Sequence, residues 1–193
     1  MEHPDFARDM EPIRVERQPV PFFKGLQVDG YRMPNGEFRV GITGASVVLG
    51  YSENWLSRLM GRETGTSIKA LRGLGFTEET QKVVSETSRG DREAQTISLR
   101  DFNRLISYAV FDGKKAALAL QLALTEVALN DFFRDAFGET PLSINEKRQL
   151  FYEAYAATIS PEDWRQMDKE DILRIAIMGE GNRRDEIERG FLE

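Results

Sequence analysis

The chain contains no cysteine and a single histidine, His3, among its 193 residues. Without cysteine it has no disulfide, no thiolate nucleophile and no cysteine-based zinc site, which favours a reducing, cytoplasmic compartment. One histidine near the N-terminus is a poor basis for a Ser-His-Asp triad or a zinc centre. We therefore expect a non-catalytic protein with no metal and no cofactor.

Long hydrophobic runs and a secretory leader are also missing. The first residues include two acids and lead into no apolar segment of the kind found in signal peptides. The longest apolar stretch, Ala116 to Leu129, contains Gln121, Thr125 and Glu126 and falls short of the roughly 20 residues that a membrane span needs. We expect a soluble protein that does not enter a membrane.

The net charge of −6 is unevenly distributed along the chain. Residues 32–115 carry 13 Lys and Arg against 10 Asp and Glu, a balance of +3, whereas residues 116–193 carry 9 against 16, a balance of −7. A basic middle beside an acidic C-terminal region can indicate an anionic partner at one surface.

Turn residues predict two β-hairpins. The four prolines of residues 1–25 indicate an extended N-terminal arm with one strand around Ile13–Arg17. Asn35-Gly36 is typical of a type I′ turn, which predicts a hairpin between Val28–Met33 and Glu37–Ile42. A second hairpin is expected between residues 82–87 and 94–97, with its tip at residues 88–92.

Capping residues and glycines predict helices in the rest of the chain. The longest, Lys114 to Phe137, has apolar residues on more than one face, so it must be buried on two sides, by its own domain or by a second subunit. We expect self-association through it. The other helices are expected at residues 43–49, 52–60, 66–72, 98–111, 143–157, from 160, and 169–178.

These elements predict an α+β fold in which two hairpins and short helices pack on a long central helix. The expected organisation is an arm over residues 1–25, an α+β domain over 26–138, a helical extension over 139–179 and a charged tail over 180–193.

The segment from Ile42 to Leu59 has the pattern of a helix-turn-helix. Small Ala45 lets two helices approach, Gly50 makes the turn, and Leu56 and Leu59 anchor the second helix. Two short helices packed at a corner would show the same pattern, with a polar outer face because water covers it. Both interpretations stay open at the level of sequence.

Basic and polar side chains near this segment favour DNA. Four cations lie between Trp55 and Gly75 against the single acid Glu63, and the second hairpin carries two arginines at its expected tip. Such side chains reach phosphates and base edges. The residues predicted to contact DNA are Ser52, Asn54, Ser57, Arg58, Arg62, Lys69, Arg72, Arg89 and Arg92.

The order of a hairpin, Leu49-Gly50-Tyr51-Ser52, a polar hairpin and Ile97-Ser98 leading to Leu105-Ile106 resembles the Bro-N and KilA-N domains. Those domains bind DNA in phage, viral and bacterial antirepressor-like proteins. The resemblance spans about residues 28–138 and implies a regulatory or phage-related role. Gly41 and Gly44 depart from it, at positions where an aromatic and an acidic residue are expected.

Two other functions compete with DNA binding. Asp101 and Asp112-Gly113-Lys114 have the spacing of a magnesium-dependent nuclease motif, but such a motif needs its acids on adjacent strands and here they flank a predicted helix. The stronger alternative is a protein-interaction or oligomerisation module that uses the long apolar helix and the acidic C-terminal helices. In that case the helix-turn-helix pattern is only scaffold.

Overall fold

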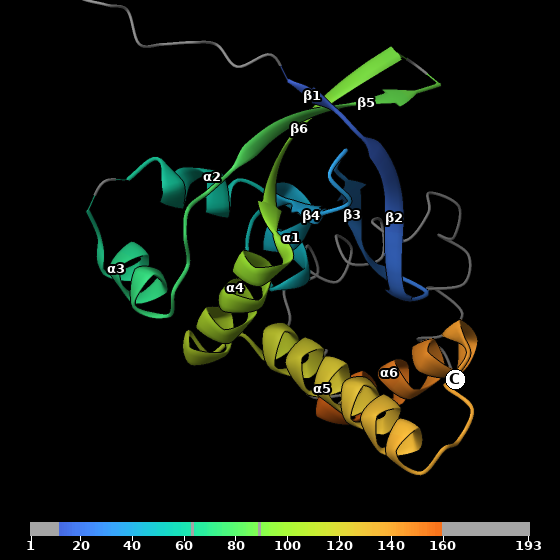
Figure 1. Cartoon of the computed structure of the whole chain (residues 1–193). Helices are drawn as coiled ribbons and strands as arrows, with labels where there is room; N and C mark the ends of the chain where they lie inside the picture. The colour runs from blue at the N-terminus through green and yellow to red at the C-terminus, as the bar shows by residue number, and fades with distance from the viewer. Residues whose placement is uncertain (1–11, 63, 89, 160–193) are drawn as a thin grey trace, which may run out of the picture.

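The computed structural model describes residues 12–62, 64–88 and 90–159, and a six-stranded sheet crosses this part of the chain (Figure 1). The strand order is β1-β5-β6-β4-β3-β2. β1 pairs parallel with β5, and every other pair is antiparallel. The strands are β1 (Ile13–Arg14), β2 (Glu16–Phe23), β3 (Leu26–Arg32), β4 (Phe38–Gly41), β5 (Gln81–Thr87) and β6 (Gly90–Ser98).

Six helices accompany the sheet within the described ranges, so the predicted α+β class is confirmed. Three short helices lie in the middle of the chain and three longer ones follow the second hairpin. The helices are α1 (Ile42–Val48), α2 (Trp55–Met60), α3 (Thr66–Gly73), α4 (Leu99–Phe111), α5 (Lys115–Ala136) and α6 (Ile144–Thr158). The helices expected from residue 160 onward lie outside the described residues.

The hairpin of β3 and β4 is present, but its turn differs from the predicted type I′. Gly36 has a positive φ of 85° whereas Asn35 does not. The amide of Met33 donates to the carbonyl of Glu37 (2.8 Å), which leaves a three-residue loop. That geometry needs one left-handed residue, and Gly36 supplies it.

The N-terminal arm carries two strands, β1 and β2, where a single strand around Ile13–Arg17 was expected. β2 pairs with β3 from Glu16 to Phe23 and forms one edge of the sheet. Pro19 and Pro21 suggested an irregular segment, yet proline is tolerated in an edge strand because one side of that strand needs no ladder hydrogen bonds. The pairing shifts its register between Pro21 and Phe23.

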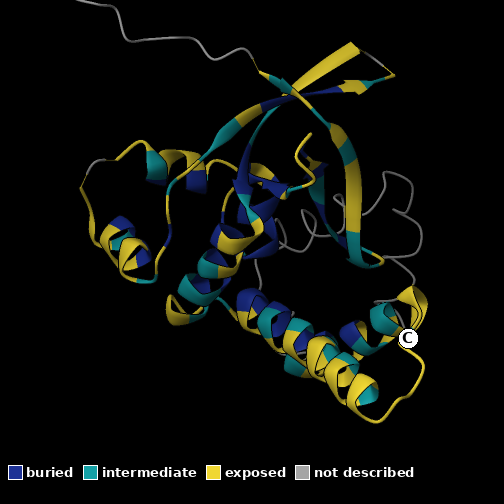
Figure 2. Cartoon of the chain, in the orientation of Figure 1, coloured by how far each residue is buried: buried dark blue, intermediate teal, exposed yellow. Residues whose placement is uncertain are grey.

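The long helices close the core beneath the sheet. α5 packs against both α4 and α6, and the buried cluster runs from Leu26 in β3 and Ile97 in β6 to Leu120 in α5 (Figure 2). α6 was expected to lie in a helical extension outside the α+β domain. Its residues Phe151 and Tyr155 are instead buried in this same cluster. Phe22 of β2 stacks on Phe151 with 5.3 Å between ring centroids.

Serine caps begin two of these helices as predicted. The Ser98 hydroxyl accepts a hydrogen bond from the amide of Asp101 at the start of α4. Ser143 forms a full capping box with Glu146 at the start of α6. In both cases the serine satisfies an amide that the first helical turn leaves without a backbone partner.

Candidate nucleic-acid interface

α1 and α2 form the predicted pair of short helices about a glycine turn. Gly50 has a φ of 81°, a left-handed conformation that glycine adopts at little cost, and the amide of Tyr51 donates to the carbonyl of Ser46 (3.0 Å). Leu49 and Leu56 are fully buried on the inner side of the pair. The small-residue and leucine pattern therefore places one face of both helices against the core.

The ends of these helices differ from the prediction. β4 runs directly into α1, so Gly41 occupies the N-cap position and the helix begins at Ile42 instead of residue 43. α2 begins at Trp55 with Asn54 at its N-cap, whereas the helix was expected from residue 52. Consequently Ser52 and Asn54 precede α2. Of the predicted DNA contacts, Ser57 and Arg58 are the two that lie within this helix.

An aromatic cluster attaches the turn to the junction of α4 and α5, and sequence reasoning missed it. The Tyr51 and Trp55 rings stack with 3.8 Å between centroids, and the Lys114 ammonium lies 4.8 Å from the centre of the Tyr51 ring. The Tyr51 hydroxyl donates to Asp112 (2.8 Å). Burial and this bond raise the pKa of Tyr51 well above its ordinary value. The turn thus has a fixed position against α5.

The polar side of the pair is open to solvent. Ser52, Asn54, Ser57 and Arg58 are all exposed, as is Arg62 immediately after α2. α3 lies beside α2 and adds exposed Lys69 and Arg72. The structure therefore brings seven of the nine predicted DNA contacts onto two neighbouring helices and the segments around them.

The charges on this surface are not equivalent. Within the described part of the chain, the side chains of Arg58, Arg62 and Lys69 form no hydrogen bond or ion pair with another residue. Arg72 instead pairs with Glu78, which raises the pKa of the guanidinium and compensates its charge. The available positive charge comes from the first three side chains.

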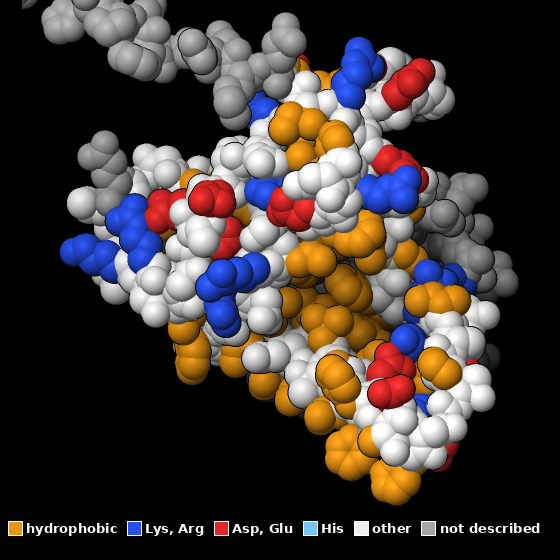
Figure 3. All heavy atoms as spheres, viewed as in Figure 1, with side chains coloured by type: hydrophobic (Ala, Val, Ile, Leu, Met, Phe, Trp, Pro, Cys, Tyr) orange, Lys and Arg blue, Asp and Glu red, His pale blue; other side chains and the backbone are white. Residues whose placement is uncertain are grey.

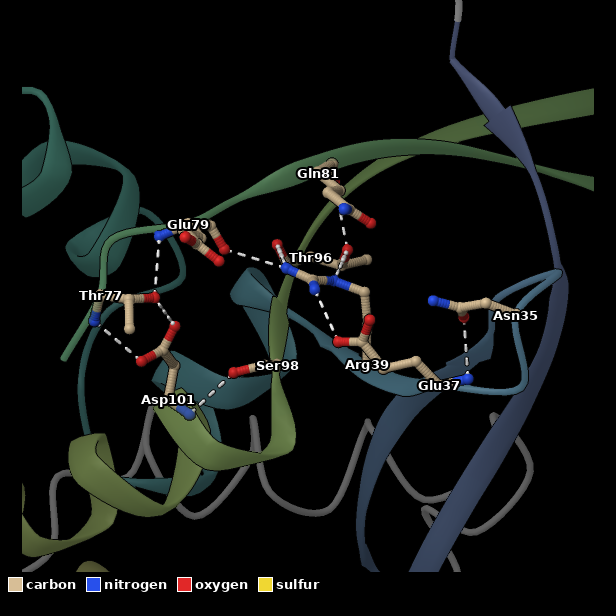
Figure 4. Close-up of polar contacts among 9 residues, drawn as sticks. All are labelled: Asn35, Glu37, Arg39, Thr77, Glu79, Gln81, Thr96, Ser98 and Asp101. Atoms are coloured by element: carbon tan, nitrogen blue, oxygen red, sulfur yellow. Dashed lines mark hydrogen bonds and ion pairs between the residues drawn. The ribbon is translucent and has the colours of Figure 1, made fainter. Parts of the chain in front are cut away.

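Two anchors hold the segment between α3 and β5 (Figure 4). Asp101 is fully buried and accepts hydrogen bonds from the amide (2.9 Å) and hydroxyl (2.7 Å) of Thr77. The buried Arg39 guanidinium donates to the Glu79 carbonyl (2.9 Å) and to the Thr96 hydroxyl (3.1 Å). These bonds fix the end of α3 relative to the sheet and to α4.

The predicted basic tip does not join this surface. The turn of the second hairpin is shorter than expected, because Thr87 pairs with Gly90, and Arg92 therefore lies within β6 opposite Ser85. Figure 1 shows the paired ends of β5 and β6 at the upper right, away from α2 and α3. Neighbouring Asp91 pairs with Arg14 (3.0 Å), so the strand ends there are of mixed charge. Arg89 lies outside the described residues.

The residues of the possible nuclease motif do not converge. Asp101 and Asp112 flank opposite ends of α4, which at 1.5 Å per residue are about 16 Å apart. Both carboxylates also have protein partners, Thr77 and Tyr51 respectively. The two acids have this spacing in the sequence because they lie at the two ends of one helix.

No family model, curated protein or solved structure matches the chain. The likeness to Bro-N and KilA-N domains therefore stays a prediction from short motifs.

One helix of the described ranges, α5, is long and apolar enough to cross a membrane by length and composition. The apolar stretch considered too short for this purpose lies within its 22 residues. With one such helix, the described chain does not have the character of a protein with several membrane spans.

Proposed function

We propose that this protein binds duplex DNA through the surface of α2 and α3, without catalysis or a cofactor, in a regulatory or phage-related role in the cytoplasm. The observation that carries the proposal is the exposure of Asn54, Ser57 and Arg58 on a helix pair whose opposite face is fixed in the core. Asn and Arg are the side chains that form bidentate bonds with adenine and guanine edges.

The electrostatics support the same surface. Arg62 follows α2 and Lys69 lies on the neighbouring α3; neither side chain has an acidic partner in the described chain, so both are available for phosphates. Phosphate contacts orient a protein on the duplex, whereas base contacts choose the sequence. We therefore assign base contact to Asn54 and Arg58 and phosphate contact to Arg62 and Lys69.

The test is a selection of preferred duplexes from a random library, followed by binding assays with full-length variants. Arg58→Ala should weaken binding to the selected duplex by about 5- to 150-fold, equivalent to about 1–3 kcal/mol, and should reduce discrimination against other sequences. Arg32→Ala is the matched control, because it removes the same charge from the sheet, where Arg32 pairs with Glu16.

The proposal fails if the parent protein binds no duplex at low salt. It also fails if Arg58→Ala and Arg32→Ala affect binding equally, because α2 would then have no special role.

A protein-interaction module is the second candidate, and one observation favours it. The outer face of α5 exposes large apolar side chains, including Phe132 at 73% and Phe133 at 64%. Exposed apolar patches of this kind are typical of association surfaces. The two functions are compatible because α2 and the outer face of α5 are separate surfaces.

A further inference from the structure

The two faces of α5 have different surroundings. Its inner face, which includes Ala117, Leu120 and Ala123, is fully buried against the rest of the fold. The opposite face is also apolar but exposed, and Figure 3 shows hydrophobic side chains in a row along the lower edge of the molecule. The exposed large residues of α5 and the residue after it are Leu118, Leu122, Leu129, Phe132, Phe133 and Phe137.

The spacing of this exposed face is that of a coiled-coil seam. Residues 118, 122, 125, 129, 132 and 136 alternate in steps of four and three, and all except Thr125 are apolar. The hydroxyl of Thr125 donates to the carbonyl of Gln121 (2.8 Å), so its polar group is already satisfied within the helix. A narrow stripe with this period matches another helix better than it matches an extended segment.

The exposed area is sufficient for a dimer. Phe132, Phe133 and Phe137 are 73%, 64% and 78% exposed. At about 200 Å² for a fully exposed phenylalanine, they offer roughly 400 Å² per copy. The three leucines add roughly 200 Å² more. Two copies together therefore offer about 1,200 Å² of exposed apolar side-chain surface at and beside the seam, at the lower limit of standard stable interfaces.

We propose that α5 pairs in antiparallel orientation with α5 of a second copy of this chain, with the two-fold axis at the level of residue 127. This pairing places Leu118 opposite Ala136, Leu122 opposite Phe132, and Thr125 opposite Leu129. Every large side chain of the seam then faces a different and complementary residue, which favours close packing. The proposal does not depend on DNA binding.

Charge selects the antiparallel orientation over the parallel one. Lys114 and Lys115 lie at the N-terminal end of α5, and its C-terminal end carries Asp131 and Asp135 together with Arg134, which pairs with Glu139 (3.2 Å) and leaves that end net acidic. An antiparallel pair brings the basic end of each helix to the acidic end of its partner and opposes the two helix dipoles. A parallel pair would place like charges together and would stack Phe132 against its own copy.

Sedimentation of the full-length protein at tens of micromolar is the first test. We expect a particle of twice the 22.0 kDa chain mass. The double variant Leu122→Gln, Phe132→Gln should weaken the dimer at least tenfold, because each substitution occurs twice in the interface. Phe38→Gln is the matched control, because Phe38 is 58% exposed on β4 and should leave the dimer intact.

The absence of cysteine provides a second test of orientation. Leu118→Cys protein mixed with Ala136→Cys protein should form a mixed disulfide under mild oxidation, whereas either variant alone should not cross-link readily. Cross-linking of each variant with itself would establish the parallel orientation and overturn the proposal.

Two other results would also overturn it. A monomer whose cysteine at position 118 is protected from thiol reagents would mean that another part of the same chain covers the seam. Sedimentation with neutral phospholipid vesicles that is lost in the double variant, without any dimer in solution, would mean that the seam meets a membrane.

Discussion

Replacing Asp101 with Ala should strongly destabilise the protein, because it removes the anchor between α3 and α4. The Asp101 side chain is 0% exposed and accepts two hydrogen bonds from Thr77, one from the amide and one from the hydroxyl. Hydrogen bonds to a charged group contribute about 1.5–3 kcal/mol each, and exposed Thr77 can recover part of this from water. We expect a loss of about 2–4 kcal/mol in the free energy of unfolding.

Two milder variants separate the contributions. Asp101→Asn keeps one acceptor for the Thr77 amide and should cost about 1 kcal/mol, because its amide group can donate to the Thr77 hydroxyl. Thr77→Val removes the hydroxyl bond to Asp101 and also the acceptor of the Glu79 amide (3.2 Å), and should cost about 1–2 kcal/mol. Urea unfolding followed by circular dichroism measures all three. If the free energy of unfolding of Asp101→Ala lies within about 0.5 kcal/mol of the parent value, the two bonds from Thr77 do not stabilise the fold and do not anchor α3 to α4.

Three further predictions concern the turn at Gly50, the cap of α6 and the buried tyrosines. Gly50→Ala should cost about 1–2 kcal/mol in thermal unfolding, because φ is 81° although the added Cβ would meet nothing closer than 3.8 Å; an unchanged melting temperature would contradict this. Ser143→Ala should cost about 1 kcal/mol and speed amide exchange in the first turn of α6. Hydrogen bonds with Ser143 lower the pKa of Glu146, so the stability that Glu146 contributes is present at neutral pH and lost as the pH falls through that lowered pKa. The capping role would be refuted if the parent showed no loss of stability in acid, or if the Ser143→Ala variant showed the same loss as the parent. Burial raises the pKa of Tyr51 and Tyr155, so stability from both should be constant below about pH 10 and fall above it; early ionisation of all five tyrosines in an ultraviolet titration would count against their burial.

Local signals in the sequence predicted most of the helices and both hairpins. Ser98 and Ser143 mark helix starts because their hydroxyls satisfy amides that any helix leaves unpaired. Gly113 and Gly138 follow the ends of α4 and α5 with positive φ values that glycine accepts at little cost. Such effects depend on neighbours in the chain, so they can be recognised without the fold.

Features that depend on distant contacts were missed. The partner of β2 is β3, but β1 pairs with β5, some 70 residues later, and nothing near Ile13 indicates that pairing. The buried Arg39 occupies a strand position like any exposed arginine in the sequence, and its Thr96 partner is 57 residues away. Likewise, α6 was expected to be peripheral. Its contact with the core, through Phe151 on Phe22, joins segments that are far apart in the sequence, so no local pattern indicates it.

The candidate surface was predicted in part. Exposure of Ser57 and Arg58 follows from helical periodicity once Leu56 and Leu59 face the core. The positions of Arg72 and Arg92 do not follow from it, because one depends on an ion pair with Glu78 and the other on the length of a turn. Local patterns thus identify which side of a helix is exposed to solvent. They do not identify which charged residues from distant parts of the chain lie on the same surface.

Salt dependence of duplex binding tests the proposed function most directly. If Arg58, Arg62 and Lys69 each engage the DNA, the logarithm of the binding constant of the full-length protein should fall with the logarithm of salt concentration with a slope of about −2 to −3. The double variant Arg62→Ala, Lys69→Ala should reduce the magnitude of that slope by about 1.8, because each lost phosphate contact contributes about 0.9. No binding at about 50 mM salt, or a slope that the double variant leaves unchanged, would contradict DNA binding by this surface.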